Sequence, residues 1–483
     1  MTPAFLDDDK PREECGVFAV HGHPDAAAHA VLGLHALQHR GQEAAGIVAF
    51  DGRQFRSRKA TGLVADGFND PHVLAELKGH AAIGHVRYAT TGASMLRNVQ
   101  PLFADLVAGG IAIAHNGNLT NALNLRRSLA ARGALFQSTT DTEVVVHLVA
   151  HSKARAIRDR LVEALDQVEG AWSLVALVDD AVIGVRDPLG VRPLVLGRLG
   201  DAHVLASETC ALDILGAEFV RDLDPGEMVI VDGDGVHSRR PFRPKRRRFC
   251  VFEYVYFARP DSRLDGKGVY EIRKRIGEEL AREAPAGADL VVPVPDSGVP
   301  AAIGFAQASG IPFELGIIRN HYVGRTFIEP TDSIRHLGVR LKHNANRASL
   351  EGRRVVLVDD SIVRGTTSTK IVSMVRQAGA REVHLRIASP PTVHPCFYGV
   401  DTPERAKLLA ALHSVEEMGR LIGADSLAFV SIDGLYRAAG EGGRDGEHPQ
   451  YCDACFTGDY PTRLLDADAN EGDAQLTLLA EAD

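Results

Sequence analysis

The pattern of hydrophobic and polar positions divides this chain of 483 residues into two halves. From residue 15 to about residue 236, short apolar runs alternate with glycine-rich turns, as in the strands of a mixed α+β domain. From about residue 268 onwards, apolar segments of helical length alternate with shorter segments of strand length. That alternation predicts an α/β domain with a doubly wound parallel sheet.

The first half contains several runs short enough for strands and two segments long enough for helices. Residues 26–38 and 141–151 have helical length and composition, and we expect them to cover a sheet face. The strand-like runs are 16–20, 81–86, 111–114, 173–178 and 228–231. In the second half, the alternating segments are 270–283, 290–294, 299–308 and 313–318.

One segment of the second half joins a buried strand to charged and hydroxylated residues. Residues 355–358 read Val-Val-Leu-Val, which is typical of a strand buried on both faces, and Asp359 and Asp360 follow it directly. Residues 364–368 then read Arg-Gly-Thr-Thr-Ser. Apolar positions at 371, 374, 375 and 378 predict that a helix begins there.

This arrangement predicts a site for a phosphorylated sugar. Ligands of open α/β sheets bind at the carboxyl ends of the strands, and a helix N-terminus behind a glycine-bearing loop binds phosphate. Because like charges repel, Asp359 and Asp360 suit sugar hydroxyls or a magnesium ion rather than the phosphate. We therefore expect a ribose 5-phosphate ligand, against the alternative of a solvated acidic turn. A Walker A loop is excluded because no Gly-Lys-Ser/Thr occurs here.

Composition limits the class and location of the protein. Hydrophobic residues make up 45% and charged residues 24%, as in ordinary globular proteins, and the length favours two or three domains. The net charge of −9 argues against a dedicated nucleic-acid binder. No apolar run reaches the roughly 18 residues of a membrane span, and residues 1–14 lack the apolar core of a secretory signal. We expect a soluble cytoplasmic protein whose six cysteines are ligands or catalysts rather than disulfides.

Charge and proline mark a linker and a tail. Residues 241–248 read Pro-Phe-Arg-Pro-Lys-Arg-Arg-Arg, which indicates a solvated linker or, as the weaker alternative, a nucleic-acid patch. The residues after 460 are acidic and poor in aromatic side chains, as in a mobile tail. We therefore expect a first domain over 15–240, a linker over 241–265, a second domain over 266–460 and a tail over 461–483.

Three segments of the second half resemble, in order, the amidophosphoribosyltransferases. They read Pro-Val-Pro-Asp-Ser-Gly at 293–298, Arg-Asn-His-Tyr-Val-Gly-Arg-Thr-Phe-Ile at 319–328 and Val-Asp-Asp-Ser-Ile-Val-Arg-Gly-Thr-Thr at 358–367. The resemblance implies a type I phosphoribosyltransferase domain that takes phosphoribosylpyrophosphate (PRPP), with the middle segment closing over it. The family's usual Lys-Asn-Arg-Tyr reads Arg-Asn-His-Tyr here, so the charge at His321 becomes titratable near neutral pH.

The resemblance also implies a role for each matching residue. One Mg²⁺ per subunit is held at Ser297, Asp359 and Asp360. As pyrophosphate departs, negative charge develops on its oxygens, and a magnesium ion and arginines stabilise that charge. The residues implied to bind PRPP are Arg319, Tyr322, Arg325, Ser361, Arg364, Gly365, Thr366 and Thr367.

Cys15 and four motifs of the first half resemble the glutaminase domain of N-terminal-nucleophile (Ntn) amidotransferases. Alone, the segment at Cys15 is typical of a buried cysteine that opens a strand. The motifs that follow are His-Ala-Leu-Gln-His-Arg-Gly-Gln-Glu at 35–43, Gly-His-Val-Arg-Tyr-Ala-Thr at 84–90, His-Asn-Gly-Asn at 115–118 and Thr-Thr-Asp-Thr-Glu at 139–143. The resemblance implies an α+β class II glutamine amidotransferase domain over 15–240.

In that family the cysteine is residue one of the mature enzyme, and its free α-amine is the base for its own thiol. The ordinary pKa of an α-amine is about 7.7 to 8 and that of the thiol about 8.5, so proton transfer between them costs little near neutral pH. While residues 1–14 remain attached, that nitrogen is an amide without basicity. Residues 1–14 are therefore expected to be a propeptide, removed after Glu14.

The remaining glutaminase roles follow from the same resemblance. Arg87 is implied to hold the carboxylate of glutamine in a bidentate pair, and Asp141 its ammonium group. Asn116 by its side chain and Gly117 by its backbone N–H are implied to form the oxyanion hole, just past the strand 111–114.

Four further cysteines carry a separate resemblance. Cys452 and Cys455 form a Cys-x-x-Cys pair, which by itself fits zinc, a redox pair or an iron–sulfur cluster. Together with Cys250 and Cys396, their contexts resemble the cluster-bearing branch of the amidophosphoribosyltransferases. That branch implies one structural [4Fe-4S] cluster per subunit. Cys210 is expected to be a small core residue.

The resemblances together cover about residues 15–461 and imply one activity. Such an enzyme hydrolyses glutamine at Cys15 and transfers the ammonia to PRPP, giving 5-phosphoribosylamine, glutamate and pyrophosphate at the first committed step of de novo purine (IMP) biosynthesis. The family also implies a homotetramer and feedback inhibition by purine nucleotides.

Two alternative functions would require different sets of residues. A sugar-phosphate or asparagine synthase would share the glutaminase half but would carry no PRPP loop. A non-catalytic PRPP sensor would need none of Cys15, Arg87, Asn116 and Asp141, and all four are present.

Overall fold

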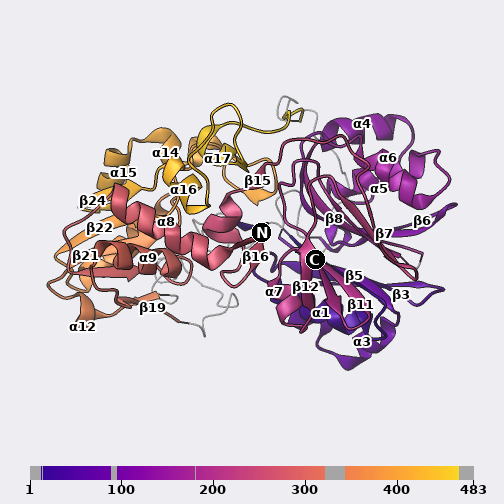
Figure 1. The fold of residues 1–483 in the computed structure, drawn as a ribbon, viewed down its shortest axis with the longest axis horizontal. Coiled ribbons are helices and arrows are strands. Elements are labelled where there is room, and N and C mark those ends of the chain that lie inside the picture. The colour runs from indigo at the N-terminus through magenta and orange to yellow at the C-terminus, as the bar shows by residue number, and fades with distance from the viewer. Residues whose placement is uncertain (1–11, 14, 89–94, 180, 321–342, 467–483) are drawn as a thin grey trace.

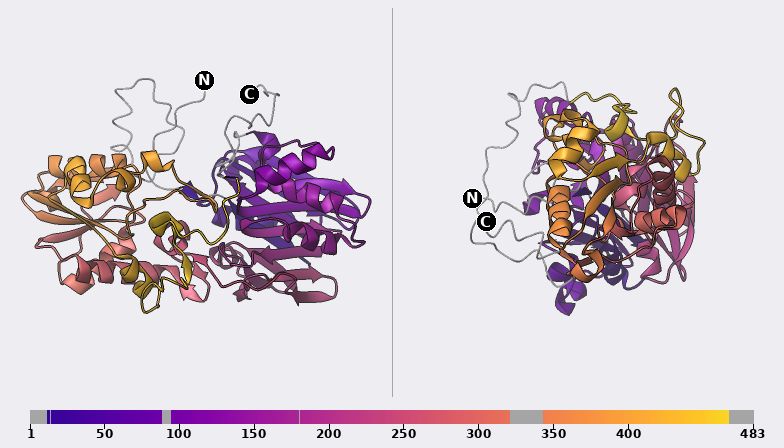
Figure 2. Two further views of the ribbon diagram at one scale, coloured as in Figure 1. Left: turned by 90° about the horizontal axis from the view of Figure 1, so that it is seen from above. Right: turned by 90° about the vertical axis from the view of Figure 1, so that its left-hand side faces the viewer.

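Two domains lie side by side along the long axis of the molecule (Figure 1). The computed structural model describes residues 12–13, 15–88, 95–179, 181–320 and 343–466. The first domain is drawn in indigo to magenta and the second in rose through orange to yellow, and the view from above keeps them at opposite ends (Figure 2). Within these ranges no helix has both the length and the apolar character needed to cross a bilayer.

The first domain is a sandwich of two antiparallel sheets. One sheet has the strand order β12-β10-β11-β2-β5-β3-β4 and the other the order β14-β13-β9-β8-β7-β6. Their bounds are β2 Gly16–His21, β3 Ala44–Phe50, β4 Phe55–Thr61, β5 Ala81–Arg87, β6 Leu102–Leu106, β7 Gly109–Leu119, β8 Gly170–Val178, β9 Ala181–Arg186, β10 Val195–Leu199, β11 Ala202–Ala206, β12 Glu218–Asp222, β13 Met228–Asp232 and β14 Gly235–Arg239.

Helices cover the outer faces of both sheets. Helix α1 (Ala26–Ala36) packs on the first sheet, and α5 (Thr142–His151) and α6 (Ile157–Leu165) pack on the second. Apolar side chains such as Val17, Ile83, Ala114 and Val175 fill the space between the sheets. Both expected helices and all of the expected strands of this half are thus confirmed.

One expected strand end is wrong. Strand β7 does not stop at residue 114 but continues to Leu119, so Asn116 and Gly117 lie inside the strand rather than just past it. The reason is its neighbour, because β8 pairs with β7 over the whole length, with Asn116 opposite Ser173 and Gly117 opposite Trp172.

The second domain contains the expected parallel sheet, with helices on both faces. Its strand order is β18-β21-β22-β24, and every neighbouring pair is parallel. The strands are β18 Leu290–Pro293, β21 Arg354–Asp359, β22 Glu382–Ile387 and β24 Ser426–Phe429. Helices α8 (Val269–Glu283), α9 (Val299–Ser309) and α16 (Ile432–Ala438) pack on one face, and α13 (Thr366–Gln377) and α15 (Val415–Ile422) on the other.

The expected segment 313–318 differs from the sequence interpretation. Only Ile317–Arg319 forms a strand, β19, and it pairs antiparallel with β20 (His343–Ala345) outside the main sheet. Phe313 keeps a single parallel bridge to Val291. A hydrogen bond of 2.9 Å from the N–H of Gly316 to the carbonyl of Glu314 folds the chain into a tight turn, which separates β19 from that bridge.

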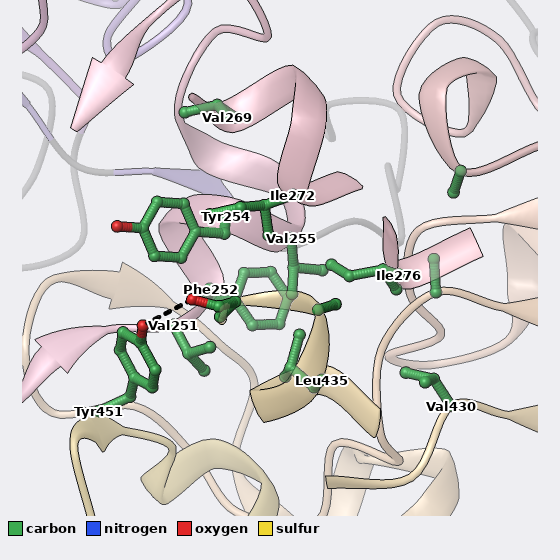
Figure 3. Close-up of a cluster of buried hydrophobic side chains, with 14 of the residues drawn as sticks. Val251, Phe252, Tyr254, Val255, Val269, Ile272, Ile276, Val430, Leu435 and Tyr451 are labelled. Atoms are coloured by element: carbon green, nitrogen blue, oxygen red, sulfur yellow. Dashed lines mark hydrogen bonds between the residues drawn. The ribbon is translucent and has the colours of Figure 1, made fainter. Parts of the chain in front are cut away.

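The segment that connects the domains is buried in the core of the second domain. Strand β15 (Phe249–Cys250) pairs in parallel with β25 (Tyr451–Cys452), and the π-helix η2 (Glu253–Phe257) follows it. Figure 3 shows side chains of this segment, including Tyr254 and Val255, gathered with the α8 residues Val269, Ile272 and Ile276. The chain therefore enters the second domain through a buried segment.

Candidate active sites in the two domains

Cys15 lies at the start of β2, where the first sheet brings it beside a buried arginine. The register pairs Gly16 with Val86, so Cys15 lies next to Arg87 at the end of β5. The exposed fraction of Cys15 is 9% and that of Arg87 is 5%. The backbone N–H of Cys15 donates to the carbonyl of Arg40 at 3.1 Å, which fixes the nitrogen that would become the α-amine after cleavage.

Strand β7 carries both residues of the predicted oxyanion hole, Asn116 and Gly117. Asn116 is fully buried, and neither the nitrogen nor the oxygen of its side-chain amide has a hydrogen-bond partner among the described residues. Buried polar groups are nearly always paired, so an unpaired amide indicates a ligand. Gly117 has φ 135°, and a Cβ there would lie 2.1 Å from the carbonyl oxygen of Ala171, so only glycine fits.

Asn98 connects Arg87 to the segment that precedes Asp141. The guanidinium of Arg87 donates to the carbonyl of Asn98. The Oδ1 of Asn98 accepts from the N–H of Thr139 at 2.9 Å, two residues before Asp141. Oδ2 of Asp141 in turn accepts from the N–H of Leu119 at 3.0 Å, at the end of the strand that carries Asn116. The fold thus assembles all of the predicted glutaminase residues at one end of the sandwich.

The carboxylates of the second domain lie at the carboxyl end of its central strand. Asp359 and Asp360 are 2% and 1% exposed. Asp360 accepts hydrogen bonds from the hydroxyls of Ser297 at 2.5 Å and Ser361 at 2.6 Å, and its N–H donates to Oδ1 of Asp359 at 2.9 Å. Hydroxyl and carboxylate oxygens are hard ligands of the kind that magnesium prefers, so this donor set fits Mg²⁺.

The predicted phosphate loop leads directly into a helix. Gly365 precedes α13 with φ 82°, and Thr366 and Thr367 begin the helix. Arg364 is half-buried, and Arg319, the last residue of β19, forms an ion pair with Asp296 beside Ser297. The other two predicted PRPP contacts, Tyr322 and Arg325, lie outside the described residues.

The four predicted cluster cysteines line one pocket, although they come from three separate segments. Cys250, Cys396, Cys452 and Cys455 share it with apolar side chains such as Phe252. Burial raises the pKa of Cys250 to about 12. Burial, and then the neighbouring cysteines, raise the pKa of Cys452 and that of Cys455 well above the ordinary value.

The pocket brings together four thiols, which is the number of ligands that a [4Fe-4S] cluster or a Cys₄ zinc site requires. A bound cationic group would offset the cost of charging these buried thiols.

Sequence reasoning missed the residues that connect the two domains at the glutaminase centre. Side chains of Arg192 and Asn118 donate to the carbonyls of Tyr398 and Phe397, both at 3.0 Å. Asn118 is the last residue of the motif at 115–118, but nothing in that motif indicates a contact with the second domain. Glu253, which accepts a hydrogen bond from Arg192, does leave a signal in the sequence. It is a charged residue inside the apolar run Val-Phe-Glu-Tyr-Val at 251–255, where burial is expected.

Comparison with known proteins gives full-length matches. Residues 85–213 match the glutamine amidotransferase domain family, and residues 263–388 match the phosphoribosyl transferase domain family. The chain is 60% identical to the amidophosphoribosyltransferase of Rhizobium etli, over 98% of this chain and 97% of the relative. It is 50% identical to the amidophosphoribosyltransferase of Bacillus subtilis, over 94% of this chain and 95% of the relative.

A solved structure has the same architecture. The glutamine PRPP amidotransferase from B. subtilis, described as complexed with ADP and GMP, superposes with a TM-score of 0.89 at 49% sequence identity. The match covers 93% of this chain and 98% of that one. The agreement therefore extends over both domains.

Proposed function

The chain belongs to the amidophosphoribosyltransferases, and from that premise we propose how its residues carry out the two half-reactions. It is a glutamine-dependent amidophosphoribosyltransferase of purine biosynthesis, with a glutamine amidotransferase domain and a phosphoribosyltransferase domain. Its substrates are glutamine and PRPP.

In the first half-reaction, the thiol of Cys15 attacks the amide carbon of glutamine. The α-amine of Cys15, exposed by removal of residues 1–14, takes the thiol proton and then protonates the departing ammonia. Water hydrolyses the resulting thioester to glutamate. Each step passes through a tetrahedral oxyanion, which Asn116 and Gly117 stabilise by hydrogen bonds.

The observation that carries this assignment is the side-chain amide of Asn116. It is fully buried and has no partner among the described residues, yet it lies at the end of the sandwich that holds Cys15 and Arg87. Arg87 pairs with the carboxylate of glutamine, and Asp141 binds its ammonium group. These contacts hold the amide carbon against the thiol.

In the second half-reaction, ammonia attacks the anomeric carbon of PRPP and pyrophosphate leaves. Ser297, Asp359 and Asp360 would hold Mg²⁺, which supplies positive charge against the departing oxygens. The N-terminus of α13 and residues 361–367 bind the 5-phosphate. Arg319 carries a permanent positive charge beside this site.

A [4Fe-4S] cluster fits the pocket of Cys250, Cys396, Cys452 and Cys455. We expect it to tie the connecting segment and the C-terminal segment to the second domain. Anaerobically purified protein should be brown, with about four irons and four sulfides per chain. Colourless protein with one zinc per chain would reject the cluster. Replacement of Cys210, which lies in the first domain, should leave the iron content unchanged.

Regulation and assembly extend the proposal. The B. subtilis structure is complexed with ADP and GMP. We infer that purine nucleotides inhibit this enzyme too, and that it acts in the cytoplasm as a homotetramer. Sedimentation with and without ADP and GMP would test the assembly and its response to nucleotides.

The test of the proposed function compares glutamine with free ammonia as the nitrogen source. Cys15→Ala should abolish glutamine-dependent synthesis while free ammonia still supports it. Equal loss with both sources would reject Cys15 as the nucleophile. N-terminal sequencing of the purified protein should begin at Cys15. A precursor that cannot be cleaved should lack glutaminase activity, because its Cys15 nitrogen is an amide.

A further inference from the structure

Two fully buried arginines, Arg40 and Arg192, lie next to the residues of the glutaminase centre. The carbonyl of Arg40 accepts the N–H of Cys15 at 3.1 Å. The Nε of Arg192 donates to the carbonyl of Tyr398 at 3.0 Å. The side chains of both arginines are 0% exposed. One arginine therefore contacts the nucleophile, and the other contacts a segment of the second domain.

Residues 397–399 of the second domain lie against Gly117, the glycine of the proposed oxyanion hole. Gly399 has φ 102°, and a Cβ on it would lie 3.0 Å from Cα of Gly117 and 3.1 Å from Nη2 of Arg192. Asn118, the next residue of β7, donates to the carbonyl of Phe397 at 3.0 Å. The position of Gly117 is thus set by residues 397–399 together with Arg192.

One carboxylate joins the two arginines. Oε2 of Glu253 lies 2.7 Å from Nη2 of Arg40, and its Oε1 lies 3.0 Å from Nη1 of Arg192. The side chain of Glu253 is 0% exposed. Burial raises the pKa of Glu253, but the two guanidinium charges outweigh burial and hold that pKa below its ordinary value. The bridge is therefore ionised at neutral pH.

Glu253 belongs structurally to the second domain. It is the first residue of η2, whose apolar residues Tyr254 and Val255 pack with Ile272 of α8 (Figure 3). On the other side of Arg40, the first domain supplies its own carboxylate, Glu208, which accepts from Nε of Arg40. The glutaminase centre is thus supported by one carboxylate from each domain.

We propose that Glu253 is a positioning residue for glutamine hydrolysis. By holding Arg40 and Arg192 at once, its carboxylate fixes the backbone of Cys15 relative to Gly117, so the spacing of nucleophile and oxyanion donor depends on a residue of the second domain. The inference rests on the proposed function, because it assumes that Cys15 and Gly117 act as assigned there. Glu253 itself touches no reacting atom.

The test is Glu253→Gln in the mature enzyme, which contains both domains and begins at Cys15. The amide oxygen can accept from one arginine, but the amide nitrogen then faces the other guanidinium, so the bridge opens on one side. We expect kcat for glutamine hydrolysis to fall at least about tenfold. KM for glutamine should stay within about twofold, because Arg87 and Asp141 are not disturbed. Synthesis from free ammonia should also stay within about twofold.

The matched control is Glu227→Gln. Glu227 is also a buried carboxylate, 1% exposed, and it accepts from Arg221 and Ser238 within the first domain. Its replacement removes a buried charge without touching the bridge, so kcat for glutamine should be unchanged. Equal losses in the two variants would show a general effect of buried charge and would overturn the proposal.

A second pair of variants separates positioning from folding. Glu253→Asp keeps the charge and should recover part of kcat at unchanged KM. If Glu253→Gln does not fold, Arg192→Lys removes one side of the bridge while keeping the charge, and it should lower kcat for glutamine but not synthesis from ammonia. Unchanged glutamine kcat in a folded bridge variant would overturn the proposal. The proposed function fails separately, if Cys15→Ala still hydrolyses glutamine.

Discussion

The glutaminase centre and the transferase centre differ in what their polar groups do before substrate binds. In the first domain the side-chain amide of Asn116 is fully buried and has no partner among the described residues. In the second domain Asp360 is equally buried but already accepts hydrogen bonds from Ser297 and Ser361. If Asn116 acts as proposed, the glutaminase centre is preorganised for a charge that forms only during the reaction. The carboxylates of the transferase centre would have to exchange partners to bind the proposed magnesium ion.

This difference follows from the two folds. The proposed oxyanion residues Asn116 and Gly117 lie within β7, which pairs along its length with β8, so their backbone cannot move without breaking the ladder. The transferase residues follow the ends of parallel strands, where loops carry the site. Preorganisation is costly for an unpaired amide, because a buried polar group without a partner costs roughly 1–3 kcal/mol. A site built on loops avoids that cost, but its residues reach their final positions only when the ligands bind.

The largest expected effect is on the transferase side. Replacing both Asp359 and Asp360 by alanine removes the proposed magnesium and sugar contacts, so synthesis should fall by more than about a thousandfold with either nitrogen source. Basal glutaminase activity should persist, because no residue of the first domain changes. We also expect PRPP to stimulate glutamine hydrolysis in the wild type, because ammonia is useful only when PRPP is bound. The double variant should lose that stimulation, because it can no longer bind PRPP productively.

The assay measures phosphoribosylamine formation and glutamate release with and without PRPP. Asp289→Asn serves as a control, because it removes a carboxylate at the opposite end of strand β21, where Asp289 pairs with Arg354. That variant should retain synthesis. Stimulation by PRPP in the double alanine variant would show that the signal to the first domain begins elsewhere.

A smaller effect is expected at the preorganised centre. Asn116→Ala removes one oxyanion donor, so kcat for glutamine hydrolysis should fall about 10²- to 10³-fold. The rate with free ammonia should not change. Asn121→Ala is the control, because Asn121 is also buried near the end of β7 but its amide bonds the backbone of Gln167 and Glu169. A loss of ammonia-dependent activity in Asn116→Ala would show that the two centres are not separable in this way.

The sequence predicted those parts of the molecule that local pattern or motif order determines. The apolar run before Asp359 predicted a strand buried on both faces, and Val355, Val356, Leu357 and Val358 are all 0% exposed. The resemblance supplied the glutaminase residues, and the fold brings them together. Neither periodicity nor motif could predict that β7 continues through Gly117, because that depends on pairing with β8, more than fifty residues later in the chain.

Contacts between the domains were beyond sequence reasoning for a related reason. Glu253 contacts Arg40 and Arg192, which lie 213 and 61 residues away in sequence. The apolar residues around Glu253 indicate that it is buried, but nothing in the sequence indicates that Arg40 and Arg192 are its partners, because charged residues usually lie on the surface. Only the tertiary structure buries all three together. The roles of Tyr322 and Arg325 stay predictions, because these residues lie outside the described part of the chain.

The smallest expected effect concerns the stability of the glutaminase half at low pH. His85 of β5 is fully buried, and burial, followed by the charge of Arg87, lowers the pKa of its imidazole to about 3. His115 and Lys59 lower this pKa further, whereas a hydrogen bond to the carbonyl of His115 raises it. At neutral pH the ring is therefore uncharged, which keeps an extra positive charge away from Arg87 and from the proposed oxyanion hole.

The sign of the pH dependence follows from this shift. Between about pH 3 and pH 6.5 the unfolded chain binds a proton at His85 and the folded chain does not. The free energy of unfolding should therefore decrease as pH falls below about 6.5, by up to about 1.4 kcal/mol per pH unit from this residue. His85→Gln retains a hydrogen-bond donor for the carbonyl of His115 and should remove that contribution, as urea denaturation from pH 7 to pH 4.5 would measure. The exposed His72→Gln should keep the wild-type slope, and an equal slope in His85→Gln and wild type would show that His85 is not held neutral.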